Sequence, residues 1–560
     1  MMIHRRLKRH GLFLLLAALV VAAGSTAGCD YLSYDETETI TEDDVFNRFF
    51  RVKGFLTNTY RQIPPGFNSV GGAMRASAAD NAEEINQAEE VHNFNDGSWS
   101  AINTVDAQWA NMYEGIRKAN RFLEGIEGQR FEDIQFNPIY DRFMEEYDNY
   151  PYEARFLRAY FYFLLAKRYG GVPLITETID DRERANSVEP ASFEEVIDFI
   201  VSECEAVAPE LPVRFENVSA RETGRATRGA AMALKARALL YAASPLHNES
   251  GSTEAWERAA TAAGAIIDSS YYSLASNYSS VFNTTSNPGL IFERRHGPFN
   301  FFERSNFPPG YEGGDPGTAP SQNLVSTYDM QTTGKDIDAP DSGYDPDNPY
   351  QDRDPRLAQT VITNNSIFKG DTVKIWRGGK DGPPGSNATP TGYYLRKYVI
   401  EDISLDPNNT TTQQHTWVLF RYAEVLLNYA EAVNEAYGPQ GTAAGLNMSA
   451  TEAVNMVRER VDMPPLQEGL GRGEFRQKVR EERRVELAFE NHRFWDIRRW
   501  QIGPSTQEIY GVNIDRLGEN NFEYERVLVE DRVWNDRMYL YPIPQNEVFI
   551  NESLEQNPGW

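Results

Sequence analysis

The stretch Glu482–Trp500 reads ERRVELAFENHRFWDIRRW, and it says more about the fold of this 560-residue chain than any other segment. Its spacing places Arg483, Glu486 and Glu490 on one side of a helix, where they would form an ion-paired face. On the opposite side we expect three side chains to pack inward, namely Val485, Ala488 and Phe489. Trp495 and Trp500 are interpreted as core or interface aromatics, so the stretch is structural rather than ligand-binding.

A second helical pattern lies upstream of this stretch, so helices are predicted over the region 417–500. An apolar stripe recurs at helical spacing in Leu419, Tyr422, Leu426, Tyr429 and Val433. The other face carries Glu424, Asn428, Glu431 and Glu435. A capping box, Ser449-x-x-Glu452, precedes the next periodic run, and Ser192-x-x-Glu195 does the same earlier in the chain.

Helical periodicity also dominates residues 46–270. Phe156–Leu165 is apolar nearly all round, as expected for a helix buried between others. Arg228–Ala243 holds seven alanines, and small residues let neighbouring helices approach closely. We therefore predict a mainly α fold of tetratricopeptide-like helix pairs, although no strict 34-residue consensus repeats along the chain.

The region 271–416 has a different composition, rich in glycine, proline, asparagine and aromatic residues. The run Pro308–Gly317 can only be loop. A loop region of this length inside a folded protein usually carries function, and its aromatic content favours a ligand-facing surface. The last part of the chain, 501–560, is expected to be an irregular tail. The chain thus divides into an N-terminal helical region, 46–270, and a C-terminal region, 271–560.

The N-terminus predicts export and lipidation. Four basic residues precede the 13-residue apolar run Gly11–Ala23, which is too short to span a bilayer. Small residues then lead directly to Cys29, the arrangement that bacterial lipoprotein processing requires. We expect a signal peptide over 1–28, acyl chains on Cys29 as the membrane anchor, and a polar tether over 29–45.

Charge and the remaining cysteine exclude several classes of protein. The formal net charge is −27, and such a surface repels phosphate backbones, so nucleic acid is not expected as a partner. Cys204 follows Val196 and Ile200 at helical spacing, which predicts a buried, inert thiol.

The motifs of the common enzyme classes do not occur. The chain has no His-Glu-x-x-His, phosphate-binding loop, Cys-x-x-Cys or Gly-x-Ser-x-Gly sequence, so we expect no catalysis and no cofactor. Calcium is the one ion that the sequence would allow. Its ligands would come from an acidic run that lacks the EF-hand spacing and is better interpreted as a solvated loop: Asp336, Asp338, Asp341, Asp345, Asp347, Asp352 and Asp354.

Six motifs in a constant order carry a resemblance to a known family. They are Trp109–Asn120, Glu153–Tyr162 with Gly170–Leu174, Ala230–Pro245, Arg421–Ala432, Glu482–Trp500, and Tyr541–Gln545 with Gln556–Trp560. Together they make the chain resemble the SusD/RagB family of outer-membrane nutrient-uptake lipoproteins. The resemblance implies a surface-exposed lipoprotein of the cell outer membrane that sits as a lid on a SusC-like TonB-dependent β-barrel transporter. Members hold oligosaccharides, or in some branches peptides, and do not cleave them.

Ligand contacts are expected on the loops, since sugar rings need flat aromatic side chains for stacking and planar polar groups for paired hydrogen bonds. The aromatic candidates are Trp99, Tyr311, Trp376 and Tyr394, with Asn81, Asp96 and Arg377 as polar partners. Phe299, Phe301, Phe302 and Phe307 cluster nearby and are interpreted equally well as side chains that bury the loop.

The sequence favours a glycan-binding uptake lipoprotein and leaves three alternatives open. One is a peptide-binding protein of the same architecture. Another is a helical-repeat scaffold for envelope proteins without a small ligand, and the weakest is a secreted hydrolase. The ligand and the individual transporter cannot be predicted from the sequence.

Overall fold

The computed structural model describes residues 41–215, 223–284, 287–443 and 445–560. The expected signal peptide and the expected lipidation site Cys29 lie outside these residues. The tether was expected to extend to residue 45, but helix α2 (Glu42–Phe46) already begins at residue 42. Thr41 and Asp44 form a capping box that satisfies the first free amides of this helix.

Long helices make up most of the structure, which confirms the mainly α prediction; helix accounts for 41% and strand for 12%. The long helices are α3 (Phe49–Tyr60), α5 (Trp109–Gly125), α7 (Tyr150–Tyr169), α9 (Phe193–Val207), α10 (Arg228–Ala243), α11 (Thr253–Asp268), α16 (Tyr422–Tyr437), α17 (Ala450–Glu459) and α18 (Arg472–Glu486). Shorter elements between them are η2 (Glu132–Ile134), α6 (Tyr140–Tyr147), β2 (Val172–Pro173), α8 (Arg182–Ala185) and β3 (Pro190–Ala191). No helix among the described residues is long and apolar enough to cross a membrane.

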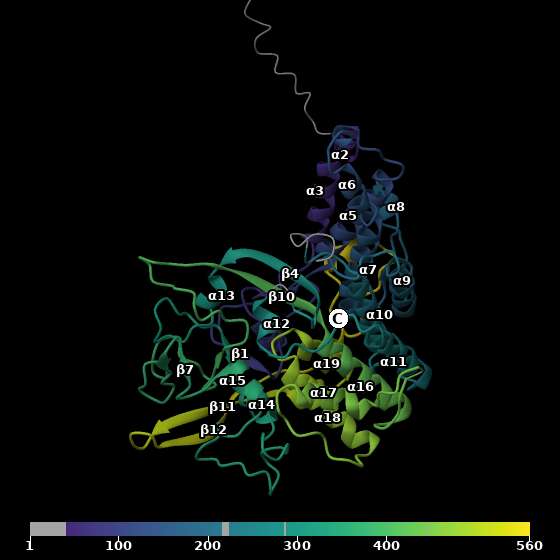
Figure 1. Cartoon of the computed structure of the whole chain (residues 1–560). Coiled ribbons are helices and arrows are strands. Elements are labelled where there is room, and N and C mark those ends of the chain that lie inside the picture. The colour runs from purple at the N-terminus through teal and green to yellow at the C-terminus, as the bar shows by residue number, and fades with distance from the viewer. Residues whose placement is uncertain (1–40, 216–222, 285–286, 444) are drawn as a thin grey trace, which may run out of the picture.

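The long helices stack as successive neighbours. α3 packs on α5, α5 on α7, α7 on α9, α9 on α10 and α10 on α11. The stack then passes directly from α11 to α16, which in turn contacts α17 and α18. Figure 1 shows this column from the blue helices at the top to the green helices below. The chain between α11 and α16 is therefore an insertion into one continuous helical stack.

Small residues and caps explain the close packing of the stack. Gly115 of α5 lies against the ring of Phe161 on α7, where an added Cβ would come within 2.6 Å of the ring. On α10 most of the alanine side chains are buried against neighbouring helices. The capping boxes predicted at Ser192 and Ser449 are both present and start α9 and α17.

The inserted region is joined to the stack by two antiparallel strands, β4 (Leu290–Phe299) and β10 (Gln413–Arg421). Between them the chain is mostly irregular, as expected, with these short elements: α13 (Phe301–Arg304), β5 (Thr318–Pro320), α14 (Gln322–Thr327), α15 (Pro355–Thr360), β6 (Val361–Ile362), β7 (Ile367–Phe368), β8 (Asp371–Thr372) and β9 (Tyr394–Leu395). The short helix α12 (Ser280–Asn283) precedes β4. The helix expected from residue 417 begins only at Tyr422, because the preceding residues belong to β10.

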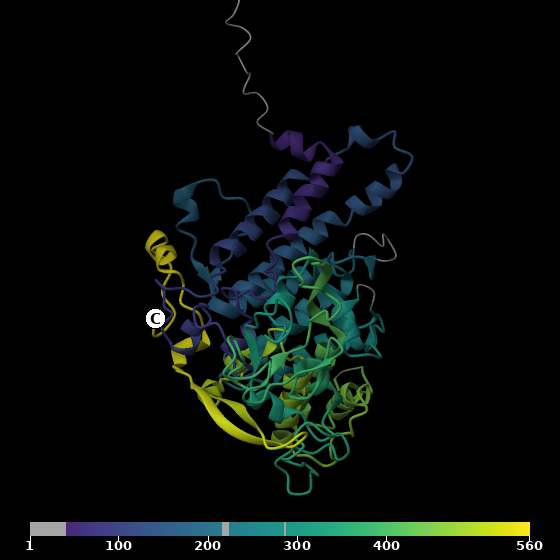
Figure 2. The same cartoon turned by 90° about the vertical axis from the view of Figure 1, so that its left-hand side faces the viewer.

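Two other expectations about secondary structure are wrong. Helices were expected to dominate 46–270, but the segment 61–108 contains only η1 (Arg75–Ala78), β1 (Ala82–Glu84) and α4 (His92–Asn95), because Pro64-Pro65-Gly66 and Gly71-Gly72 interrupt any helix. The tail, expected to be irregular, contains the hairpin of β11 (Glu508–Arg516) and β12 (Phe522–Asp531). In Figures 1 and 2 this yellow hairpin lies far from α2. The tail also holds η4 (Gly503–Thr506), η5 (Asp536–Tyr539) and α20 (Gln545–Ile550).

The stretch Glu482–Trp500 does not form the single helix that was expected for it. α18 ends at Glu486, and positive φ angles at Phe489 (62°) and Asn491 (66°) turn the chain into α19 (His492–Arg499). Arg483 therefore pairs with Asp496 rather than with Glu486. Val485, Ala488 and Phe489 are buried as expected.

Glu486 is the centre of a buried network of charges that joins distant segments. Its carboxylate accepts hydrogen bonds from Arg356 of α15, Arg421 of β10 and Arg460, the last at 2.6 Å. Burial alone would raise the pKa of Glu486, but these guanidinium groups hold the pKa well below its usual value. The polar face expected on α16 is likewise buried: Glu424 pairs with Arg237, and Glu431 with Arg499.

Candidate functional site

A polar pocket of about 500 Å³ lies where the irregular segment 61–108 meets the inserted region, around β1 in Figure 1. This volume falls within the range of roughly 300–1,000 Å³ that is typical of small-molecule sites. Its lining comes from three parts of the chain: Asn68, Gly72, Glu84, Ile85, Asn86, Gln87 and Glu89; Ser305, Asp315, Pro316, Gly317 and Thr318; and Asn387.

Strand pairing builds the floor of this pocket. β1 pairs antiparallel with β5, so that Glu84 lies opposite Thr318, and the Ile85 amide donates to the Gly317 carbonyl at 2.7 Å. A Cβ at Gly317 would lie 2.5 Å from the Oε1 atom of Glu84, so a larger residue here would displace the Glu84 carboxyl group. The pairing therefore holds two segments that are distant in sequence on either side of one cleft.

Hydrogen bonds between the lining residues fix the polar side chains in place. The Asn68 amide nitrogen donates to Ser305 Oγ at 2.9 Å, and the Asn387 amide nitrogen donates to Asp315 at 2.6 Å. The Asn86 amide nitrogen donates to Glu89 at 2.9 Å. Side chains that are already held in one orientation lose less conformational entropy when a ligand binds.

All charged residues that line the pocket are acidic: Glu84, Glu89 and Asp315. Burial, together with the neighbouring Glu89 and Glu83, raises the pKa of Glu84 to about 8. The Glu84 carboxyl is therefore mostly protonated at pH 7, where it can both donate and accept a hydrogen bond. The pocket suits uncharged or cationic ligands and disfavours sulfate and carboxylate groups.

Phe301, four residues before Ser305 of the pocket lining, carries an exposed aromatic ring. Phe301 is 46% exposed and stacks on Phe299 at 4.3 Å, and Phe299 stacks on His415 at 3.9 Å. The Phe301 carbonyl accepts a hydrogen bond from Ser305, which lines the pocket. Phe302 and Phe307, in contrast, are buried. They pack the loop, which agrees with the interpretation of these phenylalanines as side chains that bury the loop.

Three of the expected ligand residues are buried, so the expectation that they are exposed on loops is wrong. Trp99 is 1% exposed and packs against Tyr541 and Trp560. The Asn81 side-chain oxygen accepts from Arg484 at 2.7 Å, and the Tyr394 hydroxyl donates to the Asp381 carbonyl at 2.5 Å. Each of these three side chains packs or hydrogen-bonds inside the protein and is therefore not exposed to a ligand.

The other four expected residues are accessible, but none lines the pocket. Asp96 is exposed and accepts from the Ser98 amide in its own turn. Tyr311 lies beneath the Lys380 ammonium at 3.9 Å. Trp376 packs on Phe522 of the hairpin, and exposed Arg377 lies 3.7 Å from Asp515. Contact of these four residues with a ligand stays a prediction.

Sequence reasoning missed the residues that do line the pocket. Asn86, Gln87 and Glu89 lie in the polar run Asn81–Glu90, and Asp315 and Gly317 lie in a segment recognised only as loop. Asparagine, glutamate and glycine are common in any surface turn, so their types alone gave no signal. Only the pairing of β1 with β5 brings them together.

The acidic run between residues 336 and 354 does not form a metal site in the described part of the chain. Asp341 pairs with Lys335, and Asp354 caps α15 and binds Arg356. Asp336 and Asp345 accept hydrogen bonds from amides within their own turns. These carboxylates therefore stabilise turns and a helix start.

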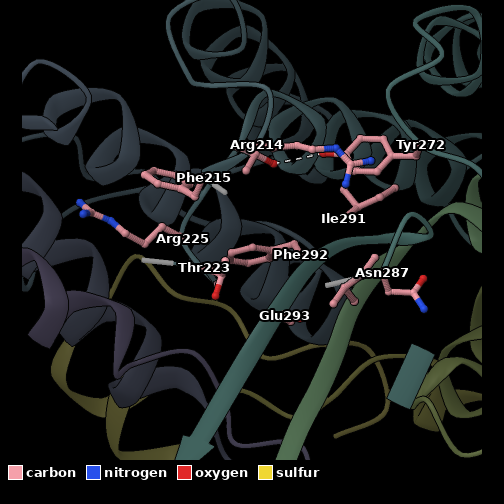
Figure 3. A pocket seen from close by; sticks show the side chains of 12 residues that line it. Arg214, Phe215, Thr223, Arg225, Tyr272, Asn287, Ile291, Phe292 and Glu293 are labelled. Atoms are coloured by element: carbon pink, nitrogen blue, oxygen red, sulfur yellow. Dashed lines mark hydrogen bonds between the residues drawn. The ribbon is translucent and has the colours of Figure 1, made fainter. Parts of the chain in front are cut away.

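A second, smaller pocket lies beside β4 (Figure 3). The Arg214 guanidinium lies 5.1 Å from the centre of the Tyr272 ring, and Phe215 and Phe292 add apolar surface. The enclosed volume of about 60 Å³ accommodates a few water molecules but no sugar ring. The pocket around β1 is therefore the better candidate for ligand binding.

A tetratricopeptide-like helical stack with an inserted, loop-rich region defines the architecture of a helical-repeat protein. The particular family follows from comparison with known proteins. The profile of the SusD family matches residues 265–560, and a second profile, described as starch-binding associating with outer membrane, matches residues 30–240. The chain belongs to the SusD family.

Individual relatives agree with this assignment. A SusD-like protein of solved structure from Bacteroides fragilis is 28% identical, with a TM-score of 0.76 over 93% of this chain and 99% of that chain. A SusD-like carbohydrate binding protein from the same organism is 29% identical, with a TM-score of 0.73 over 91% and 100%. SusD-like protein P2 of Formosa agariphila is 25% identical over 87% of each chain.

Proposed function

We propose that this protein is a cell-surface lipoprotein that binds a neutral oligosaccharide in the pocket around β1 and delivers it to a TonB-dependent transporter, without cleaving it. The observation that carries the proposal is the pocket lining, in which amides, hydroxyls and carboxyl groups converge without any basic side chain. The description of the family as starch-binding and associated with the outer membrane supports it.

The chemistry of the pocket suits a sugar. Each sugar hydroxyl both donates and accepts a hydrogen bond, and Asn86, Asn387 and the Glu84 carboxyl offer both kinds of group. The exposed ring of Phe301 supplies the flat apolar surface on which the C–H face of a pyranose stacks. We therefore assign the polar subsite to the pocket and the stacking subsite to Phe301.

The remaining parts of the proposal come from the N-terminus and the family. Acyl chains on Cys29 would hold the protein at the outer membrane, since each buried methylene contributes about 0.8 kcal/mol. A SusC-like β-barrel is the expected partner. Membranes solubilised in mild detergent should yield the barrel together with this protein, whereas recovery with several soluble proteins and no barrel would favour the scaffold alternative.

A glycan array tests the ligand class. The purified protein should bind one or more neutral glycans, with starch fragments as the first probes, and should bind sulfated and uronic acid glycans at least tenfold more weakly. The acidic lining predicts this order, because an anionic ligand would be repelled and desolvated at the same time. Preference for polyanionic glycans would contradict the proposal.

A peptide is the second candidate, and one observation favours it. The carboxylates of Glu89 and Asp315 in the pocket would attract an amino terminus or a lysine side chain. A pool of short basic peptides on the same array distinguishes the two candidates. Binding to these peptides but to no neutral glycan would replace the oligosaccharide by a peptide.

A further inference from the structure

A group of three potential metal ligands lies behind the wall of the pocket. His92 begins α4, Glu83 lies in β1, and Glu530 lies in β12. One nitrogen of His92 and one oxygen from each carboxylate all lie within 4.8 Å of one another. Three elements that are far apart in sequence thus bring one imidazole and two carboxylates to a common point.

The orientation of the imidazole ring directs one of its nitrogens towards the carboxyl groups. His92 Nε2 lies 3.1 Å from the backbone carbonyl oxygen of Asn86. A carbonyl oxygen only accepts hydrogen bonds, so Nε2 carries a hydrogen, and Nδ1 is the ring nitrogen that could bind a metal ion. This Nδ1 atom faces Glu83 Oε1 at 3.8 Å. At this distance no direct hydrogen bond joins the two atoms, and a metal ion between them could contact both.

Arg532 contacts both carboxyl groups of this cluster. Its Nε donates to Glu530 at 2.5 Å, its Nη2 donates to Glu83 at 2.6 Å and to the Ala82 carbonyl, and its Nη1 donates to the Ala79 carbonyl. One guanidinium thus pairs with two carboxyl groups, which also hydrogen-bond to each other. The cluster therefore places two carboxyl groups and one imidazole around a common point, with Arg532 fixing the orientation of both carboxyl groups.

We propose that His92, Glu83 and Glu530 bind a divalent transition-metal ion of the zinc type, with a water molecule as the fourth ligand. Zinc binds one imidazole nitrogen and two carboxylate oxygens at about 2.0–2.2 Å, which sets ligand atoms about 3.4 Å apart in a tetrahedron. The present separation of 3.8 Å between His92 and Glu83 needs only a small contraction.

The surroundings already provide the outer contacts that such a site needs. The hydrogen bond from Nε2 to the Asn86 carbonyl fixes the tautomer that presents Nδ1 to the metal. Arg532 orients both carboxylates through their other oxygens. Because Asn86 also lines the pocket, the metal would tie the pocket wall to the β11–β12 hairpin, whatever ligand the pocket binds.

Titration calorimetry with zinc chloride tests the site on the untagged mature protein after removal of metal by a chelator. We expect one zinc ion per chain, and His92→Gln and Glu530→Gln should each weaken binding at least tenfold. His296→Gln is the matched control, because its Nε2 also faces a backbone carbonyl, that of Pro65 at 2.9 Å, but no carboxylate completes a site. This control should bind zinc as the wild type does.

Thermal unfolding shows whether a variant that does not bind zinc is still folded. In the absence of metal, His92→Gln should unfold close to the wild-type temperature, because His92 is partly exposed. Zinc should raise the unfolding temperature of the wild type and of His296→Gln but not that of His92→Gln. An absence of zinc binding by the wild type, or equal binding by the wild type and His92→Gln, would overturn the proposal.

Discussion

Replacing Glu486 by glutamine should destabilise the whole fold, because its carboxylate joins three buried arginines. The side chain is completely buried, and glutamine has the same shape, so the change removes charge without creating a cavity. Arg421 keeps Glu490, and Arg356 keeps Asp354 and Glu482. For Arg460, Glu486 is the one carboxylate with which it forms an ion pair among the described residues.

The size of the effect follows from the loss of a buried charged partner. Breaking such a pair costs about 3–5 kcal/mol, because the remaining charge stays buried without compensation. The entropy of unfolding is about 2.1 cal/mol/K per residue, or about 1 kcal/mol/K for a chain of this length unfolding as one unit. The melting temperature at pH 7 should therefore fall by about 3–5 °C.

Differential scanning calorimetry of the wild type, Glu486→Gln and Glu481→Gln measures this effect. Glu481 pairs with Lys478 at the surface, so its replacement should change the melting temperature by less than about 1 °C. The pKa of Glu486 is lowered by folding, so its stabilisation exists above the unfolded value near 4.5 and is lost as the pH falls below it. Equal melting temperatures for both variants at pH 7 would refute the reasoning.

Three further predictions concern single residues. Because folding raises the pKa of Glu84 to about 8, the wild type should lose stability relative to Glu84→Gln as the pH rises from about 4.5 to 8; a melting-temperature difference that does not change with pH would contradict this. Cys204 is buried, which raises the pKa of its thiol, so a thiol reagent should leave the native protein unmodified and label one cysteine after denaturation; two labelled cysteines would mean that Cys29 is not acylated. Gly317→Ala should weaken ligand binding about tenfold with little change in melting temperature, measured by calorimetry, since the added Cβ crowds Glu84 inside the pocket.

Local patterns predicted the helical stack well. The 3.6-residue periodicity of Phe156–Leu165 and the alanines of Arg228–Ala243 depend on neighbouring turns of one helix, and the capping boxes depend on residues three apart. The composition change near residue 271 also identified the inserted region. These features are local, so one sequence contains all the information that they need.

Long-range pairing could not be predicted in the same way. Glu424 was placed only on the polar face of its helix, and nothing in the sequence indicated that it pairs with Arg237, 187 residues away. Trp99 was expected in an exposed loop, yet the C-terminal residues Tyr541 and Trp560 cover it. The pocket exists only because β1 pairs with β5, and neither strand is long enough to give an alternating pattern.

The proposed binding site is tested most directly by the affinity for the best neutral oligosaccharide, measured by titration calorimetry. The double variant Asn86→Ala/Asn387→Ala removes two polar groups from the pocket, and Asn348→Ala is the matched control, an exposed asparagine that also donates to a carboxylate, that of Asp345. At about 1 kcal/mol or more per hydrogen bond, the double variant should bind at least tenfold more weakly while Asn348→Ala binds normally. Unchanged affinity of the double variant would place the ligand elsewhere on the protein and contradict the proposed site.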